Sequence, residues 1–139
     1  MIEPIVYGDV EWAVAQEIAE RATSFGHPIK PYAGSTDASL TGDSIQCVRV
    51  GGQELQPAIA TALIDADVRS RSEARAVQLG DVVQAVAVAA GSEQFERDGV
   101  QVVSSRIVSL PYLLPDPQHP TLHRVVVKIE FILKGRALN

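Results

Sequence analysis

The sequence predicts a two-layer α+β sandwich, with two helices packed on one face of a mostly antiparallel sheet of four to five strands. Two segments repeat apolar residues at helical spacing, and the shorter segments around them are strand-like. The links between successive strands are short enough for antiparallel pairing. With 139 residues, of which 46% are hydrophobic and 21% charged, residues 1–139 are expected to form a single domain with its own core.

The first helix is expected between Asp9 and Gly26. Asp9 is a natural N-cap, Glu11 places negative charge in the first turn, and Gly26 is a typical C-terminal stop. One face of this helix is apolar and is expected to be buried. Its members are Val10, Val14, Ile18, Ala22 and Phe25.

Three extended segments follow the first helix. Residues 29–33 form a short one, and the polar segment 34–42 is expected to be a mobile loop. The next strand, "SIQCVRVGG", ends in a Gly51-Gly52 turn, and residues 56–68 form the strand after it. The short link between these two strands favours an antiparallel hairpin.

The second helix is expected to begin at Ser70, because Glu73 three residues later completes a capping box, and to end at Gly91. Residues 94–99 then form a polar link. The buried face of this helix is expected to consist of Ala76, Leu79, Val83, Val86 and Ala90.

Two strands, residues 100–110 and 124–134, close the sequence. Alternate residues of the last strand, from Val125 to Leu133, are apolar and should face the helices. No segment remains to cover the other face of the sheet, where Ile59 and Leu63 are expected. Since monomers rarely expose large apolar patches, this face indicates oligomerisation; the alternative is that these residues fold under a loop.

The residues that usually carry catalysis do not form a recognisable pattern. Cys47 is the single cysteine and is expected to be a small buried hydrophobe. His119 and His123 have metal-ligand spacing, but a proline between them argues against a helix. Asp65 and Asp67 at a strand end are expected to be solvated or to cap the next helix. We therefore expect no enzyme activity, no cofactor and no metal.

The net charge of −5 disfavours binding to nucleic acid or to an anionic membrane. Neither a leader nor an apolar run long enough to span a membrane is visible, so a soluble protein made in the cytoplasm is expected. The one basic cluster, Arg69, Arg71 and Arg75, surrounds a helix start. These arginines either pair with acidic residues of a neighbouring subunit or are solvated.

Several stretches resemble one family over residues 5–135. They are "DVRS", the helix start "SEARA", the "LPDP" loop and the closing amphipathic strand. Together they are similar to the tail terminator proteins of long-tailed bacteriophages, especially those of actinobacterial hosts. The resemblance implies helices on one face of a mixed sheet, and a ring, expected to be a hexamer, at the head-proximal end of the virion tail.

The same resemblance implies the partners and the place of assembly. The ring would sit on the last layer of tail tube protein, stop its polymerisation and offer a surface to the head-side connector protein. DNA would pass through the lumen without specific binding. Assembly would take place in the host cytoplasm, with no membrane involved.

The proline-rich segment that joins the last two strands is unusual in composition. Prolines remove backbone donors and prevent open-ended strand pairing, while Tyr112, Leu113 and Leu114 supply apolar contact area. Residues 111–120, here named the docking segment, are expected to bind a neighbouring subunit or the tube; the alternative is a hairpin loop that covers the domain's own core. The complete set of expected interface residues is Tyr112, Leu113, Leu114, Asp116, Ile59, Leu63, Arg69, Arg71 and Arg75.

Two other functions stay open at this point. A head-completion or connector protein of a phage has a similar size and differs in the partner that it contacts. A small cytosolic ligand-binding protein or enzyme would need several polar groups that converge in an apolar pocket. The residue pattern does not assemble such a set.

Overall fold

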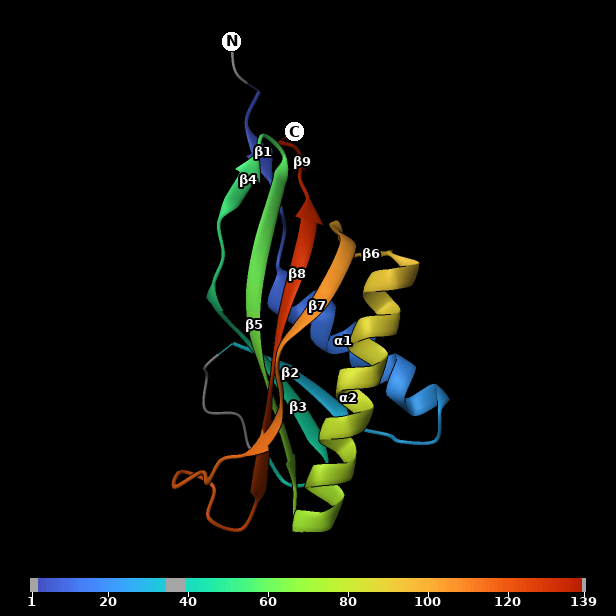
Figure 1. Ribbon diagram of the computed structural model, residues 1–139, viewed down its shortest axis with the longest axis vertical. Coiled ribbons are helices and arrows are strands. Elements are labelled where there is room, and N and C mark those ends of the chain that lie inside the picture. The colour runs from blue at the N-terminus through green and yellow to red at the C-terminus, as the bar shows by residue number, and fades with distance from the viewer. Residues whose placement is uncertain (1–2, 35–39, 139) are drawn as a thin grey trace.

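The computed structural model describes residues 3–34 and 40–138, and within them seven strands form one curled sheet with two helices on one face (Figure 1). The strand order is β2-β3-β5-β8-β7-β6, and β4 also pairs with β5. A separate pair joins the two ends of the described chain, β1 with β9. The elements in chain order are β1 (Ile5–Val6), α1 (Val10–Ser24), β2 (Lys30–Ala33), β3 (Ser44–Gly51), β4 (Glu54–Gln56), β5 (Ile59–Ser70), α2 (Glu73–Glu93), β6 (Phe95–Arg97), β7 (Val100–Leu113), β8 (His123–Lys134) and β9 (Arg136–Ala137).

The α+β class and the helices on one face agree with the sequence prediction, but the predicted sheet is too small and too regular. The structure adds β4 and β6, which are only three residues long each and carry no detectable alternation. It also makes β2 parallel to β3, a pairing that the long connection between them permits and a tight hairpin turn would exclude. The antiparallel pairing of β3 with β5 and of β7 with β8 is confirmed. The expected mobile loop at 34–42 falls largely on residues 35–39, which lie outside the described residues.

The first helix begins and ends where the sequence predicts. The carboxylate of Asp9 accepts a hydrogen bond from the amide of Trp12 at 3.2 Å, and Gly26 follows the C-cap with a φ of +86°. The predicted apolar face is buried except at its last member, Phe25, which is 74% exposed. Phe25 is the C-cap residue itself, so the helical spacing no longer determines where its side chain points.

For the second helix, the predicted buried face is confirmed, but both predicted ends are wrong. Its N-cap is Ser72 instead of Ser70, because β5 continues through Ser70, whose hydroxyl donates to Asp43 at 2.7 Å. Gly91 does not end the helix, which continues to Glu93. The five residues predicted to face the core are all buried.

The core lies between the helices and the concave face of the sheet. Phe131 and its neighbours on alternate positions of β8 are fully or almost fully buried there, as predicted. Helix α1 packs on β2 and β3, while α2 packs mainly on β7 and β8. Cys47 is also buried in this core, and burial raises the pKa of its thiol. Among the described residues, neither helix is long and apolar enough to cross a membrane.

Candidate interaction surface

The proline-rich connection is an ordered structure tied to the sheet by a buried arginine. Strand β7 extends through Leu113, so the connecting loop itself spans residues 114–122. Arg69 of β5 is only 3% exposed and donates from Nε to Asp116 Oδ2 at 2.9 Å. Its other nitrogens donate to Gln46 at 2.9 Å and to Asp67 at 3.3 Å. The loop is therefore anchored to two strands of the sheet through one guanidinium.

Asp116 in turn organises the loop around itself. Its Oδ1 accepts from the amide of Gln118 at 3.1 Å, and its Oδ2 lies 2.9 Å from Nδ1 of His119. Burial alone would raise the pKa of Asp116, but the hydrogen bonds from Arg69 and His119 outweigh it, so the pKa lies below its ordinary value. The carboxylate thus stays charged at neutral pH and joins Gln118 and His119 of the loop to Arg69 of β5.

Arg124 supplies the donors that the prolines lack. It donates from Nε to the carbonyl of Leu114 at 3.2 Å and from Nη2 to the carbonyl of Pro115 at 2.9 Å. Its Nη1 also lies 3.6 Å from Asp67, whose pKa is raised by burial despite the two nearby arginines. The carbonyls of Leu114 and Pro115 are thus satisfied within the chain, which holds the loop in one conformation before any partner binds.

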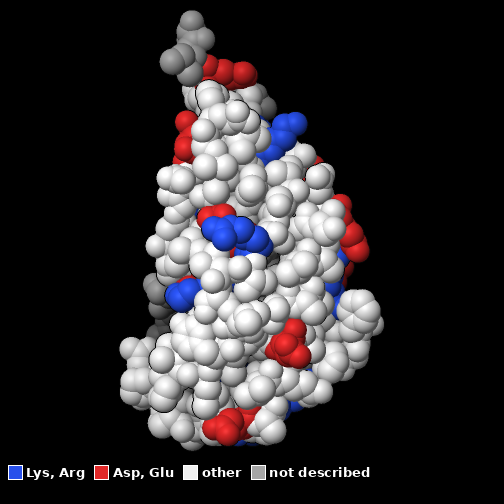
Figure 2. Space-filling view, viewed as in Figure 1, with Lys and Arg blue, Asp and Glu red and all other residues white. Residues whose placement is uncertain are grey.

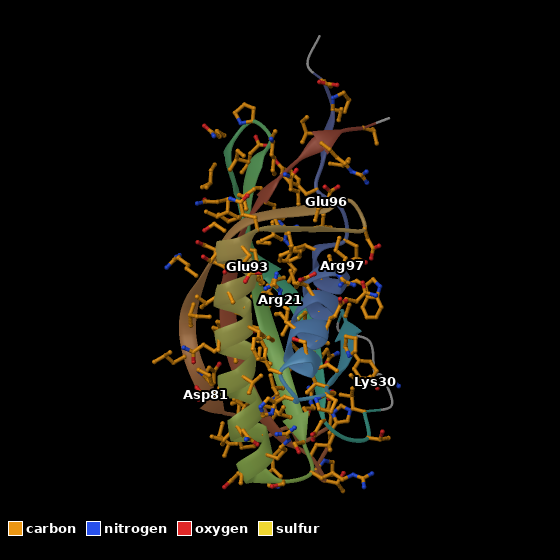
Figure 3. All side chains as sticks on the ribbon, turned by 90° about the vertical axis from the view of Figure 1, so that its right-hand side faces the viewer. Arg21, Lys30, Asp81, Glu93, Glu96 and Arg97 are labelled. Atoms are coloured by element: carbon orange, nitrogen blue, oxygen red, sulfur yellow. The ribbon has the colours of Figure 1, made fainter. Side chains whose placement is uncertain are left out.

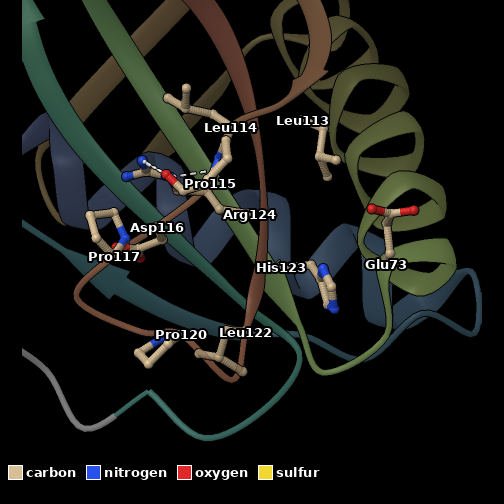
Figure 4. A pocket seen from close by; sticks show the side chains of 10 residues that line it. All are labelled: Glu73, Leu113, Leu114, Pro115, Asp116, Pro117, Pro120, Leu122, His123 and Arg124. Atoms are coloured by element: carbon tan, nitrogen blue, oxygen red, sulfur yellow. Dashed lines mark hydrogen bonds between the residues drawn. The ribbon is translucent and has the colours of Figure 1, made fainter.

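A cleft of about 490 Å³ opens beside this loop. Figure 4 shows loop residues along one side of the cleft, with Glu73 from the start of α2 and His123 from β8 on the other. The walls are mainly apolar. The cleft is lined by Glu73, Leu113, Leu114, Pro115, Asp116, Pro117, Pro120, Leu122, His123 and Arg124.

The structure separates the predicted interface residues into exposed and internal groups. Tyr112, Leu113 and Leu114 are exposed at 38%, 46% and 39%. Arg69 and Asp116, by contrast, are buried against each other and cannot contact a partner directly while the loop is in place. They act instead as internal supports of the loop, a pairing that the sequence prediction missed.

The two other predicted arginines lie near the start of α2. Arg71 is exposed in the turn before the helix. Arg75 is partly buried, with Nε 3.2 Å from Asp43 and Nη1 3.2 Å from Nδ1 of His27. The basic cluster is therefore split: Arg69 and Arg75 make internal ion pairs, while Arg71 has none with the described residues.

The outer face of the sheet is less uniformly apolar than predicted. Ile59 and Leu63 are half-buried on it, while Lys128 pairs with Asp65 at 2.8 Å. At the other end of the face, Val126 is almost fully buried. The expectation of an entirely uncovered face is thus wrong at the end next to the proline-rich loop, where the chain covers its own strand.

An apolar region formed by α2 and β7 was only partly predicted: the sequence analysis named its residues 112–114 and missed the others. Seven of the twelve large hydrophobic side chains that the structure exposes lie on α2, on β7 or just after it. This face is almost free of charged side chains (Figure 2). The signal was present in the sequence, because Asp81 is the only charged residue from 76 to 92. The seven are Val77, Val88, Val108, Leu110, Tyr112, Leu113 and Leu114.

The fold and this surface define a small α+β protein whose most developed surface feature is an apolar face bordered by an ordered loop. Its fold is similar to that of a chain in the solved structure of the virion of a native gene transfer agent particle. The similarity covers 92% of this chain and 96% of that chain, with a TM-score of 0.61 and 15% sequence identity. Neither a family model nor a curated protein matches the sequence.

Proposed function

We propose that this chain is a structural protein of a virion, and specifically a tail terminator. The observation that carries the proposal is the fold shared over almost the full length of both chains with a component of a virion particle. The finer role rests on the "DVRS", "SEARA" and "LPDP" stretches that resemble tail terminators.

In this role, copies of the chain form a closed ring, for which we propose six subunits. A ring needs two different contact patches on each subunit, because every copy contacts the next in the same head-to-tail manner. The exposed apolar face of α2 and β7 supplies one such patch without further rearrangement. The ring would sit on the last layer of tube protein, end its growth and present its other side to the head-side connector.

We propose no catalytic step for this protein. In the polar cluster around Arg69 and Asp116, the hydrogen bonds of Asp116 hold the proline-rich loop in place. No group of three or more His, Cys, Asp or Glu side chains among the described residues is arranged to hold a metal ion. The net charge of −5 suits a conduit through which DNA passes without being bound.

The docking segment offers the first test. Changing both Tyr112 and Leu113 to Ser is expected to leave the monomer folded, because both side chains are substantially exposed, and to abolish ring formation or tail joining. Circular dichroism checks the fold, and light scattering coupled to size-exclusion chromatography checks assembly. A matched control is the pair Val50→Ser and Leu55→Ser, which are similarly exposed but belong to β3 and β4. Normal rings and mature tails from the Tyr112/Leu113 variant would refute the role of this segment.

Electron microscopy of the purified protein tests the proposed function as a whole. Rings seen along their axis, which bind the end of a tail tube and stop its growth, are the expected result. Binding only to the head-side connector would instead identify a neck protein. A protein that remains monomeric with tube protein present would contradict both roles.

A further inference from the structure

A groove between α2 and β7 adjoins the docking segment, whose first residue, Pro111, lines it, but shares no lining residue with the cleft described above. It has a volume of about 560 Å³. Two of its walls are exposed hydrophobic side chains, Val77 at 53% and Leu110 at 67%. Here named the α2–β7 groove, it is lined by Val77, Gln78, Asp81, Gln84, Leu110 and Pro111.

The charge around this groove is negative and unbalanced. Asp81 is the one charged residue that lines the groove, and among the described residues its carboxylate has no cation within ion-pair distance. The nearest cation of β7, Arg106, is already paired with Glu130 at 2.8 Å. The groove therefore fits an apolar side chain that carries a positive charge beside it.

The same chain presents that combination on another side. Phe25 and Lys30 flank the link between α1 and β2, and Phe25 is the most exposed large hydrophobic side chain among the described residues. The Lys30 ammonium lies 5.5 Å from the ring centroid of Tyr32 and has no carboxylate partner in the described part of the chain. Figure 3 shows Lys30 and Asp81 at opposite edges of the molecule, with both helices between them.

We propose that the α2–β7 groove binds the α1–β2 link of a second copy of this chain. Phe25 of one subunit enters the groove against Val77 and Leu110 of the next, and Lys30 pairs with Asp81. Lys30 and Asp81 lie at opposite edges of one subunit, and Phe25 lies beside Val82 and Ala85 of α2, outside the groove. The two patches are therefore different surfaces, the contact is head-to-tail, and a subunit that uses one patch can bind a further copy through the other. The inference rests on the ring proposed above and assigns its subunit contact.

Two copies related by a twofold axis do not explain these features. Groove against groove would bring Asp81 close to its own symmetry mate, and like charges across an interface are unfavourable. It would also leave Phe25 and Lys30 uncovered. The head-to-tail arrangement covers both apolar patches and neutralises both charges in one contact.

Charge reversal tests the pairing. Asp81→Lys and Lys30→Glu are each expected to weaken assembly roughly tenfold or more, and the double variant is expected to recover most of this loss. Phe25→Ser is expected to weaken assembly roughly thirtyfold without affecting the fold, since the side chain is exposed. Glu96→Lys, a charge reversal at an exposed position of β6, is the matched control and should assemble like the wild type. Light scattering across a concentration series compares the five variants with the wild type.

Cysteine cross-linking tests the contact where association is weak. Because Cys47 is buried, a protein with Ser24→Cys and Gln78→Cys, which keeps Phe25 and Leu110, offers two accessible thiols, and oxidation is expected to produce a ladder of covalent multimers. A wild-type protein that assembles while the charge variants behave normally and no ladder forms would overturn this contact and leave the ring standing. A wild-type protein that stays monomeric, with no ladder at the highest concentration, would overturn both the contact and the ring.

Discussion

Replacing Gly91 with alanine is expected to destabilise the protein by about 3 kcal/mol or more, although alanine is the better helix former. A Cβ at this position would lie 1.9 Å from the Ser105 hydroxyl oxygen and 2.5 Å from the Ser105 backbone nitrogen. The hydroxyl can rotate, but the backbone of β7 cannot move without disturbing its pairing with β8. The last turns of α2 would have to shift away from the sheet.

Urea unfolding followed by circular dichroism measures this loss. Gly42→Ala is the matched control, because a Cβ there meets no atom within 4 Å, and it should change the stability very little. Adding Ser105→Gly to Gly91→Ala removes the side-chain part of the clash but not the contact with the backbone nitrogen, so we expect only partial recovery. Gly91→Ala with wild-type stability or better would show that α2 packs less tightly on β7 than the close approach of Gly91 to Ser105 indicates.

Gly91 also shows why the helix was predicted to end too early. A glycine after a long apolar repeat is a typical helix stop, and nothing near it in the sequence distinguishes that role from close packing. The distinction depends on Ser105, fourteen positions further on, whose hydroxyl donates to the carbonyl of Ala87 at 2.8 Å. Helix existence and the buried faces follow from local periodicity, whereas helix ends depend on such distant contacts.

In the candidate interaction surface, too, some features follow from the local sequence and others depend on contacts between distant residues. The exposure of Tyr112 and Leu113 fits a proline-containing edge strand, because β6 pairs only with Val100–Val102 and leaves the far end of β7 at the edge of the sheet. The burial of Arg69 does not follow, because its partner Asp116 is 47 positions away. An arginine next to a helix start is ordinarily solvated, and only the fold of the loop over β5 removes this one from water.

Because Arg69 and Asp116 are buried together, Asp116→Asn is expected to lower the free energy of unfolding by about 3 kcal/mol at neutral pH. The substitution keeps the size of the side chain but leaves the Arg69 guanidinium with a weaker set of partners, namely Asp67 and Gln46. It also removes the charge that faces His119. Asp65→Asn is the matched control, since the Asp65–Lys128 pair is partly exposed and such pairs contribute less than about 1 kcal/mol.

The pH dependence separates loss of the buried charge from a general loss of packing. Because the pKa of Asp116 is lower in the folded protein than in the unfolded chain, its ionised form stabilises the fold above the unfolded value of about 3.9. That contribution disappears as the pH falls through the folded-state pKa. The wild type should therefore lose stability more steeply than Asp116→Asn between about pH 5 and pH 2, and the two unfolding curves should converge in acid. A difference in stability that stays constant over this range would mean that the carboxylate holds the loop by shape alone.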